Sequence, residues 1–172
     1  MKTGTKSLLF GVHQVAWHPI TVLLAWIELY GLPSWKELIC IIIHDWGYWG
    51  KPNMDGQEGA DHPFFAARLA KKYLGYDEYM LCLLHSRHLS YSMGLTPSRL
   101  CYADKLSLKY DPWWFYLPRA WSSGELLEYR RNAERNGFVS GEKTHREWFK
   151  WAYDVMVTIG LKQKADAMPY SN

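Results

Sequence analysis

A histidine and an aspartate follow directly on an uninterrupted apolar run, Leu38-Ile-Cys-Ile-Ile-Ile43. Ser34 and Glu37, just before this run, have the spacing of a capping box, so we predict a helix from Ser34 through the apolar run. A helix that is apolar on all sides is expected to be central. His44 and Asp45 then stand at the end of a buried helix. Because a buried, unpaired carboxylate costs several kcal/mol, Asp45 requires a cation or a metal ion as its partner.

Helical patterns occupy most of the remaining chain, and no run shows the alternation typical of strands. Cap residues, first-turn prolines and glycine stops predict further helices over residues 64–73, 77–94, 98–109, 124–135 and 141–161. His85 and His88 would share one face of the helix over 77–94, because they are three residues apart. At 172 residues, without a repeat or a linker, the chain is expected to form a single all-α domain over residues 1–172.

Charge, apolar runs and cysteines argue against several protein classes. The net charge of +3 gives no strong signal for nucleic acid. No secretory signal is visible, and the longest apolar candidate for a membrane span, residues 19–27, is far short of the roughly 20 residues required. We therefore predict a cytoplasmic protein with no transmembrane segment. Cys40, Cys82 and Cys101 each lie in an apolar stretch and are expected to be buried thiols, not a disulfide framework or a thiolate metal site.

Histidines and aspartates recur in a fixed order along helices that are otherwise apolar. The order is histidine, histidine–aspartate, histidine, histidine and aspartate, which are His18, His44, Asp45, His62, His85 and Asp104. Taken singly, a histidine on an apolar face is more often a hydrogen-bonded core residue than a ligand. As an ordered set, flanked by His62-Pro63-Phe-Phe-Ala-Ala, Leu84-His85-Ser86 and Ala103-Asp104-Lys105-Leu106, they resemble the HD superfamily, a helical fold of metal-dependent phosphohydrolases.

The resemblance covers residues 10–110 and implies a single HD-domain-like helical bundle, on which residues 111–172 pack. It also implies one or two divalent transition-metal ions. One ion would be held by His18, His44, Asp45 and Asp104. A second would share Asp45 and be held also by His62 and His85. Imidazole and carboxylate ligands suit Fe, Mn, Zn, Co or Ni, so this ligand set does not identify the metal.

The leading interpretation that follows from the resemblance is a hydrolase of a phosphate ester or anhydride. Nucleotides are the substrate class that the resemblance favours. The nucleophile would be a metal-activated bridging hydroxide. Lys51 and Lys105 are the first candidates for binding the phosphate, before Arg87 and Arg99. His88 is open to several roles: a further ligand, a general acid, a phosphate contact or a surface histidine. Asp45, His88 and Lys51 are the candidate catalytic residues.

Two departures from the family patterns bear on this interpretation. The dinuclear branch commonly has HDxGK, whereas here Lys51 comes three positions late, and it could equally be a solvated loop lysine. Tyr48 replaces the acid of the HDxxE pattern in the mononuclear nucleotidase branch. A second interpretation is a di-iron oxygenase that cleaves a carbon bond, since a few members share the ligand order. A third is a non-catalytic binding module stabilised by metal.

Other features of the sequence leave the function open. Residues 110–121 contain a dense group of aromatic side chains that could cover the core, form a substrate wall, or dock on a membrane or a partner. The apolar stripe that begins at Trp148 is typical of core packing or of a dimer face, so a homo-oligomer is possible. His13 and His145 are interpreted as non-catalytic.

Overall fold

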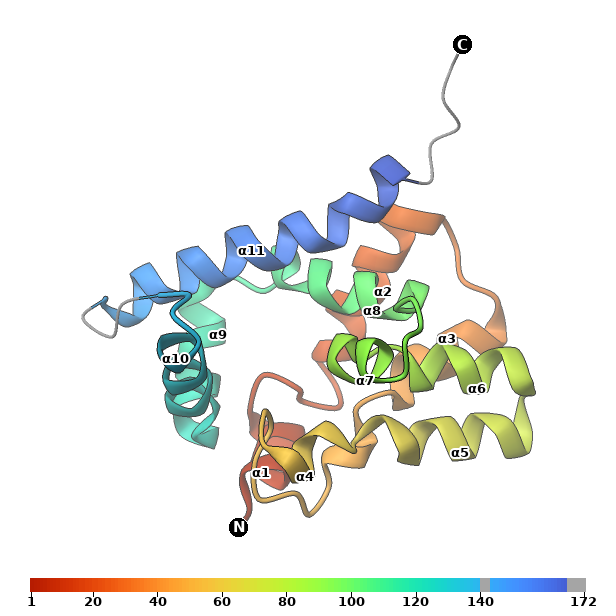
Figure 1. The fold of residues 1–172 in the computed structure, drawn as a ribbon, viewed down its shortest axis with the longest axis horizontal. Coiled ribbons are helices and arrows are strands. Elements are labelled where there is room, and N and C mark those ends of the chain that lie inside the picture. The colour runs from red at the N-terminus through yellow and green to blue at the C-terminus, as the bar shows by residue number, and fades with distance from the viewer. Residues whose placement is uncertain (140–142, 167–172) are drawn as a thin grey trace.

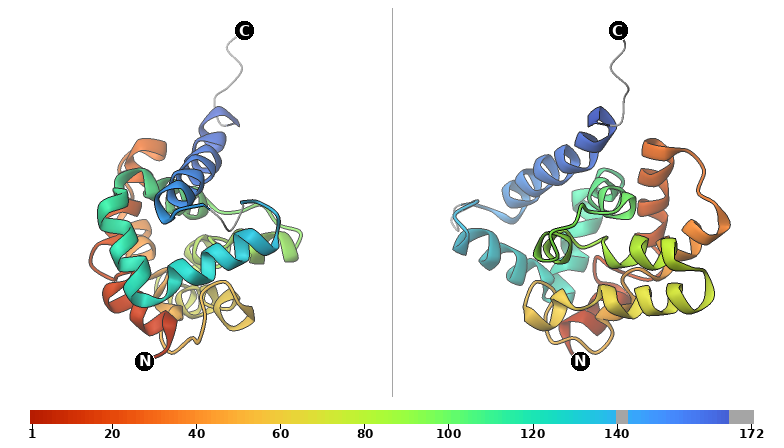
Figure 2. Two further views of the ribbon diagram at one scale, coloured as in Figure 1. Left: turned by 90° about the vertical axis from the view of Figure 1, so that its left-hand side faces the viewer. Right: turned by 45° about the vertical axis from the view of Figure 1, so that its right-hand side comes forward.

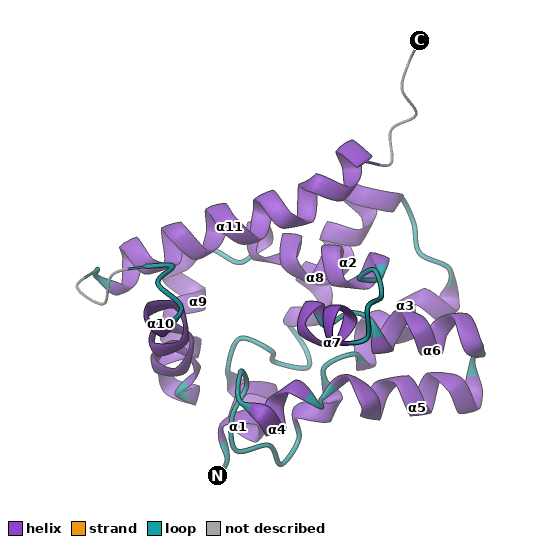
Figure 3. Ribbon diagram, viewed as in Figure 1, coloured by secondary structure: helices purple, strands orange, loops and turns teal. Residues whose placement is uncertain are grey.

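A computed structural model describes residues 1–139 and 143–166 of the chain. Within these residues the protein is all-α and has no strand, which confirms the predicted fold class (Figure 3). The α-helices are α1 (Thr3–Phe10), α2 (His18–Tyr30), α3 (Trp35–Ile43), α4 (Gln57–Ala60), α5 (Pro63–Tyr73), α6 (Tyr76–Leu83), α7 (Arg87–Ser92), α8 (Arg99–Leu106), α9 (Trp113–Ser123), α10 (Glu125–Arg135) and α11 (His145–Asp166). Two short 3-10 helices, η1 (Trp46–Tyr48) and η2 (Ser107–Tyr110), follow α3 and α8.

The helix that carries the histidine–aspartate pair forms as the sequence predicts. Ser34 Oγ accepts a hydrogen bond from the amide of Glu37 at 3.3 Å, and a carboxylate oxygen of Glu37 accepts from the amide of Ser34 at 2.8 Å. This capping box starts α3, and Cys40 and Ile41 on its inner face are fully buried. The helix ends at Ile43, so the two residues that follow it stand at the end of a core helix.

The prediction of one continuous helix over residues 77–94 is wrong, and the difference matters for the site. It is broken: α6 ends at Leu83 and α7 begins at Arg87, with Ser86 Oγ accepting from the amide of Leu89 at 3.4 Å as the cap of α7. His85 therefore lies in the break, and it does not share a continuous helix face with His88. Of the helix predicted over 141–161, the first two residues lie outside the described residues, and α11 begins at His145.

The two largest groups of buried side chains hold most of the helices together, and a third, small group consists of Leu8, Tyr48 and Met54. The larger group joins α2, α3, α5, α6 and α8, with Trp26 and Leu100 among its fully buried members. The smaller group joins α9, α10 and α11 around Leu126 and Trp148. The long helix α11 lies along α8 and α9 and so connects the two groups (Figure 1; Figure 2 shows the same arrangement from two further sides). All three cysteines are buried and free, as predicted.

The outer surface of the early helices is unusually apolar. On α2 the exposed side chains are Ile20, Leu24 and Ile27, and the exposed positions of α3 are Trp35, Leu38 and Ile42. Exposed apolar side chains are the kind of surface that partner contacts use, and the homo-oligomer stays a prediction. Among the described residues, no helix combines the length and the apolar character needed to cross a membrane.

Candidate metal centre

The six predicted ligands come from five separate segments that the core packing brings together. His18 opens α2, His44 and Asp45 link α3 to η1, His62 precedes α5, His85 lies between α6 and α7, and Asp104 is on α8. All are buried apart from Asp104, whose side chain is 11% exposed. The structure thus gathers imidazoles and carboxylates in a part of the protein from which solvent is largely excluded.

Backbone hydrogen bonds fix the orientation of three of the histidine rings. His44, His62 and His85 each donate Nδ1–H to the carbonyl oxygen of the residue three positions earlier, at 2.8, 2.8 and 2.5 Å respectively. All three rings stand at or just past helix ends. With Nδ1 committed to the backbone, Nε2 is the nitrogen that faces the cluster and is available to a metal ion.

Asp45 stands between two groups of nitrogen atoms and presents one oxygen to each. Its Oδ2 lies 3.2 Å from Nε2 of His18 and 3.1 Å from Nε2 of His44. Its Oδ1 lies 3.6 Å from Nε2 of His62 and 3.5 Å from Nε2 of His85. A carboxylate placed in this way has the geometry of a bridge between two cation sites.

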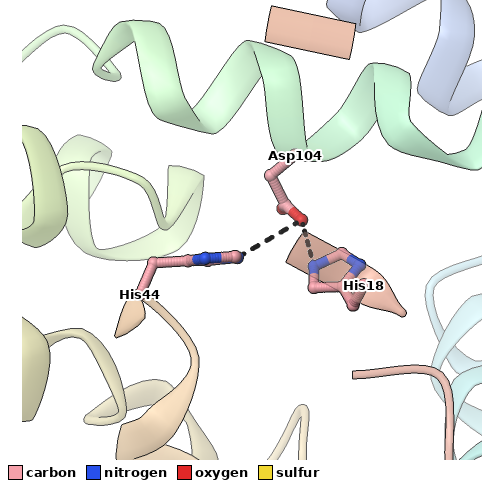
Figure 4. Close-up of side chains that lie close together, drawn as sticks. All are labelled: His18, His44 and Asp104. Carbon is pink, nitrogen blue, oxygen red and sulfur yellow. Dashed lines mark ion pairs between the residues drawn. The ribbon is translucent and has the colours of Figure 1, made fainter. Parts of the chain in front are cut away.

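Asp104 completes the first of these two groups. Its Oδ1 lies 3.1 Å from Nε2 of His18 and 3.9 Å from Nε2 of His44, so all three side chains converge on one point (Figure 4). The ligand atoms of these three residues lie within 4.8 Å of one another, as do those of His44, Asp45 and His85. Both combinations therefore have donor atoms close enough to share an ion.

Several of the converging atoms have no hydrogen bond although they are buried. Nε2 of His18, Nε2 of His44 and Oδ2 of Asp45 all lack a partner with hydrogen-bond geometry. Such atoms are expensive to bury, and each needs an explanation such as a bound ion.

The second group of donors, His62 and His85, also contains buried nitrogen atoms without a suitable partner. Nε2 of His62 and Nε2 of His85 are only 2.8 Å apart, although both rings already donate through Nδ1. Two lone pairs at this distance repel unless a proton or a cation lies beside both. Ligands about 2.1 Å from one ion and about 90° apart lie about 3.0 Å from each other. The separation of 2.8 Å between His62 and His85, and those of 3.1–3.2 Å around Oδ2 of Asp45, are close to that spacing, so these donors fit a metal ion.

The charges in the site also favour the protonation states that a metal requires. Burial would raise the pKa of Asp45, but the neighbouring imidazoles of His44, His13 and His18 hold it well below the ordinary value. Burial and the charge of His85 both lower the pKa of His62. The carboxylate is therefore ionised and His62 is neutral, as ligands must be.

His18 differs from the other rings in its preferred protonation state. Burial alone would lower its pKa, but the carboxylates of Asp104 and Asp45 raise the pKa to about 10. Without a metal ion this ring carries a proton that compensates the two acids. Metal binding would release that proton, since a ligand nitrogen must be unprotonated.

A cavity of about 710 Å³ opens onto the cluster. Asp45, His62, His85 and Asp104 form part of its wall. Arg87, His88 and Lys105 line the same cavity, and the Nζ atom of Lys105 lies 2.6 Å from a carboxylate oxygen of Asp104. Besides Asp45, three of the predicted substrate or catalytic side chains therefore line the same cavity as the cluster.

Two other predicted phosphate contacts do not line this cavity. Lys51 lies beside α1, where its carbonyl oxygen accepts from the amide of Gly4 at 3.0 Å. Arg99 forms an ion pair with Glu37 and lies over the ring of Trp26, at a different pocket. None of residues 110–121 lines the cavity, so the structure gives no support to a substrate wall there. Trp113, Trp114 and Trp121 in that segment are exposed.

Sequence reasoning missed two residues at the site. His13 lines the cavity, and Tyr48 stacks on the ring of His62, with centroids 3.9 Å apart and planes at 14°. The partner that holds His13 is Glu125, 112 residues away, at 2.8 Å. No local pattern indicates a contact over this separation. The sequence alone therefore could not place His13 at the site.

Comparisons with models of protein families, with curated proteins and with solved structures found no match for this chain. What the structure shows directly is an all-α protein with a buried histidine and aspartate cluster that is compatible with a metal site. The chemistry of that site therefore has to be argued from its geometry.

Metal binding should make the protein more stable, because it satisfies buried atoms that otherwise lack partners. At an ion concentration 100-fold above Kd, the expected gain is about 2.7 kcal/mol. For a domain of this size, that raises Tm by about 5–10 °C. The measurement is thermal unfolding of chelator-treated protein with added Mn²⁺, Zn²⁺, Co²⁺, Ni²⁺ or Fe²⁺. Asp61→Asn, at an exposed acid on the same cavity, should keep the full increase. An unchanged Tm with every metal would contradict a metal centre.

Proposed function

We propose that this protein is a metal-dependent phosphohydrolase of the HD type that cleaves a phosphate ester or anhydride. The observation that carries the proposal is the position of Asp45. Its two carboxylate oxygens face two separate groups of histidine donors at the wall of a large cavity. The ordered ligand set, which resembles that of the dinuclear HD branch, supports the same function. The six side chains His18, His44, Asp45, His62, His85 and Asp104 would hold the ions.

Divalent ions in this site would lower the pKa of a water molecule and neutralise charge on the phosphoryl oxygens. The chain's own contribution is to position the phosphate. Arg87 and Lys105 are the arginine and lysine side chains that line the cavity among the described residues. Burial lowers the pKa of Lys105, but the neighbouring Asp104 carboxylate raises it above the ordinary value, so this lysine stays cationic. Both side chains are suited to binding phosphate oxygens.

The size and lining of the cavity support a nucleotide as the substrate class. A volume of about 710 Å³ lies within the usual range of small-molecule sites, about 300–1,000 Å³. Polar side chains such as Gln57, Ser86 and Asn132 share the wall with the cations. They offer hydrogen bonds that could orient the part of the substrate that is not phosphate.

The lining also favours hydrolysis over oxygen chemistry. An oxygenase would be favoured by a closed aromatic pocket, whereas Tyr48 is the one phenylalanine, tyrosine or tryptophan among the described lining residues. A non-catalytic metal module would have no need of cations around an open cavity. Phosphoester hydrolysis therefore accounts for more of the site than either alternative.

The direct test is phosphate release by protein loaded with each candidate metal. Suitable probes are p-nitrophenyl phosphate, bis-p-nitrophenyl phosphate and a panel of nucleoside mono-, di- and triphosphates and cyclic nucleotides. We expect turnover of at least one, and none by Asp45→Asn protein. Oxygen uptake by the iron-loaded protein, measured in parallel, tests the alternative function as an oxygenase. Equal phosphate release by wild type and by Asp45→Asn for every metal and every probe would contradict the proposal.

Arg87→Met should weaken substrate binding without loss of metal. Losing a hydrogen bond to a charged group costs about 1.5–3 kcal/mol, which corresponds to a rise in KM of about 10-fold or more. Arg68→Met is the matched control, because Arg68 is exposed on α5 and does not line the cavity. Steady-state kinetics with the best substrate, together with metal analysis of both variants, would measure the effect. An unchanged KM for Arg87→Met would show that Arg87 does not bind the phosphate.

A further inference from the structure

A second buried acid lies close to the metal centre and is not explained by it. Glu125, the first residue of α10, is fully buried. Its carboxylate accepts hydrogen bonds from five groups, four of which lie outside α10. The donors are Ser7 Oγ at 2.6 Å, the amide of Val12 at 3.0 Å, His13 Nδ1 at 2.8 Å, Tyr129 Oη at 3.2 Å and Ser123 Oγ. The carboxylate is therefore ionised and held in one position.

His13 is the cationic partner of this carboxylate. Among the side chains that the structure describes, no lysine or arginine pairs with Glu125, and the ion pair that the structure shows is with His13. A carboxylate oxygen only accepts, so the 2.8 Å contact requires His13 to donate through Nδ1. A buried carboxylate is most stable beside a cation, which favours an imidazolium with a proton on both nitrogens.

The ring of His13 also forms part of the cavity wall. Its centroid lies 5.3 Å from that of His18 and 5.2 Å from that of Tyr48, so it stands at the edge of the metal cluster. The side chain is 19% exposed, and among the described residues Nε2 has no hydrogen-bond partner. Nδ1 is committed to Glu125, which leaves Nε2 as the polar atom of the ring that is free for a ligand.

We propose that His13, held by Glu125, forms an anion subsite in the cavity and donates Nε2–H to a phosphoryl oxygen. The inference rests on the proposed function, because the ligand is a phosphoryl group at the metal centre. Glu125 does not line the cavity, so it acts as a positioning residue that fixes the ring and its charge. A fixed donor loses little conformational entropy when the anion binds, which makes it more effective than a flexible lysine.

Two substitutions of His13 separate the anchoring nitrogen from the one that binds the anion. The amide nitrogen of asparagine lies near the position of Nδ1, whereas that of glutamine lies near the position of Nε2. His13→Asn should therefore keep the contact with Glu125, the fold and the metal content. It should weaken the binding of inorganic phosphate to Mn²⁺-loaded protein by about 10-fold or more, as expected for a lost hydrogen bond to a charged group. His13→Gln should recover part of that affinity.

The measurements are calorimetric titration with inorganic phosphate, metal analysis, and ring ¹⁵N NMR of Zn²⁺-loaded protein. Adding phosphate should shift the Nε2 signal of His13, and Glu125→Gln should reduce both the affinity and this shift. If His13→Asn binds phosphate as tightly as wild type, or the Nε2 signal does not move, the subsite is wrong. Phosphate binding that depends on His13, without hydrolysis of any probe, would support the subsite and overturn the proposed activity. The two proposals therefore fail separately.

Discussion

Asp45→Asn protein is expected to retain almost no transition metal after purification, while wild type binds about two ions per chain. Asp45 is the one side chain whose oxygens face both groups of histidines, at 3.1–3.2 Å on one side and 3.5–3.6 Å on the other. Asparagine has the same shape, but it removes the charge and turns an NH₂ group towards nitrogen lone pairs. The loss in affinity should exceed the 10–100-fold typical of residues that only support a ligand.

Elemental analysis of protein purified without chelators measures this loss directly. Asp61→Asn is the matched control, because it removes a carboxylate from the same cavity but not from the cluster. His62→Gln separates the two groups of donors, because His62 belongs only to the second group and its loss should leave about one ion. Unchanged metal content in Asp45→Asn protein would contradict the assignment of all six ligands.

Gly47→Ala is expected to be the most disruptive small substitution near the site. A Cβ atom at Gly47 would lie 1.9 Å from the carbonyl oxygen of His62 and 2.7 Å from its carbonyl carbon. These are backbone atoms that cannot rotate away, so either η1 or the start of α5 must move. Such overpacking costs about 3 kcal/mol or more. Because His62 would move with its backbone, the second group of donors should lose its metal as well.

Thermal unfolding and metal analysis of the same preparation would measure both effects. A cost of about 3 kcal/mol lowers Tm by about 6–12 °C for a domain of this size. Gly94→Ala is the control: its Cβ meets no atom within 4 Å, and its φ of +67° predicts a cost of about 1–2 kcal/mol without loss of metal. If Gly47→Ala had the Tm and metal content of wild type, η1 and α5 would not be packed as closely as the structure shows.

Local patterns accounted for much of the fold. The capping box of Ser34 and Glu37 involves atoms three residues apart, so the sequence alone placed the start of α3 correctly. The absence of strand alternation predicted the all-α class. The break between Leu83 and Arg87 was not predicted, because the apolar pattern continues across it. What interrupts the helix is the cap by Ser86 and the contact between His85 Nδ1 and the carbonyl of Cys82, and these compete with helical hydrogen bonds.

For the site, the sequence determined which side chains need a partner, and the tertiary structure decided where each one lies. A buried carboxylate after an apolar helix is costly wherever the helix packs, so Asp45 could be identified without coordinates. The assignment of its two oxygens to two groups of histidines could not, because it depends on how α2, α5 and α6 pack around α3. The same holds for Lys51, which lies beside α1, and for His13, which is held by Glu125 from α10. Cap and turn energies act over a few residues, whereas these placements depend on contacts between segments that only the folded core brings together.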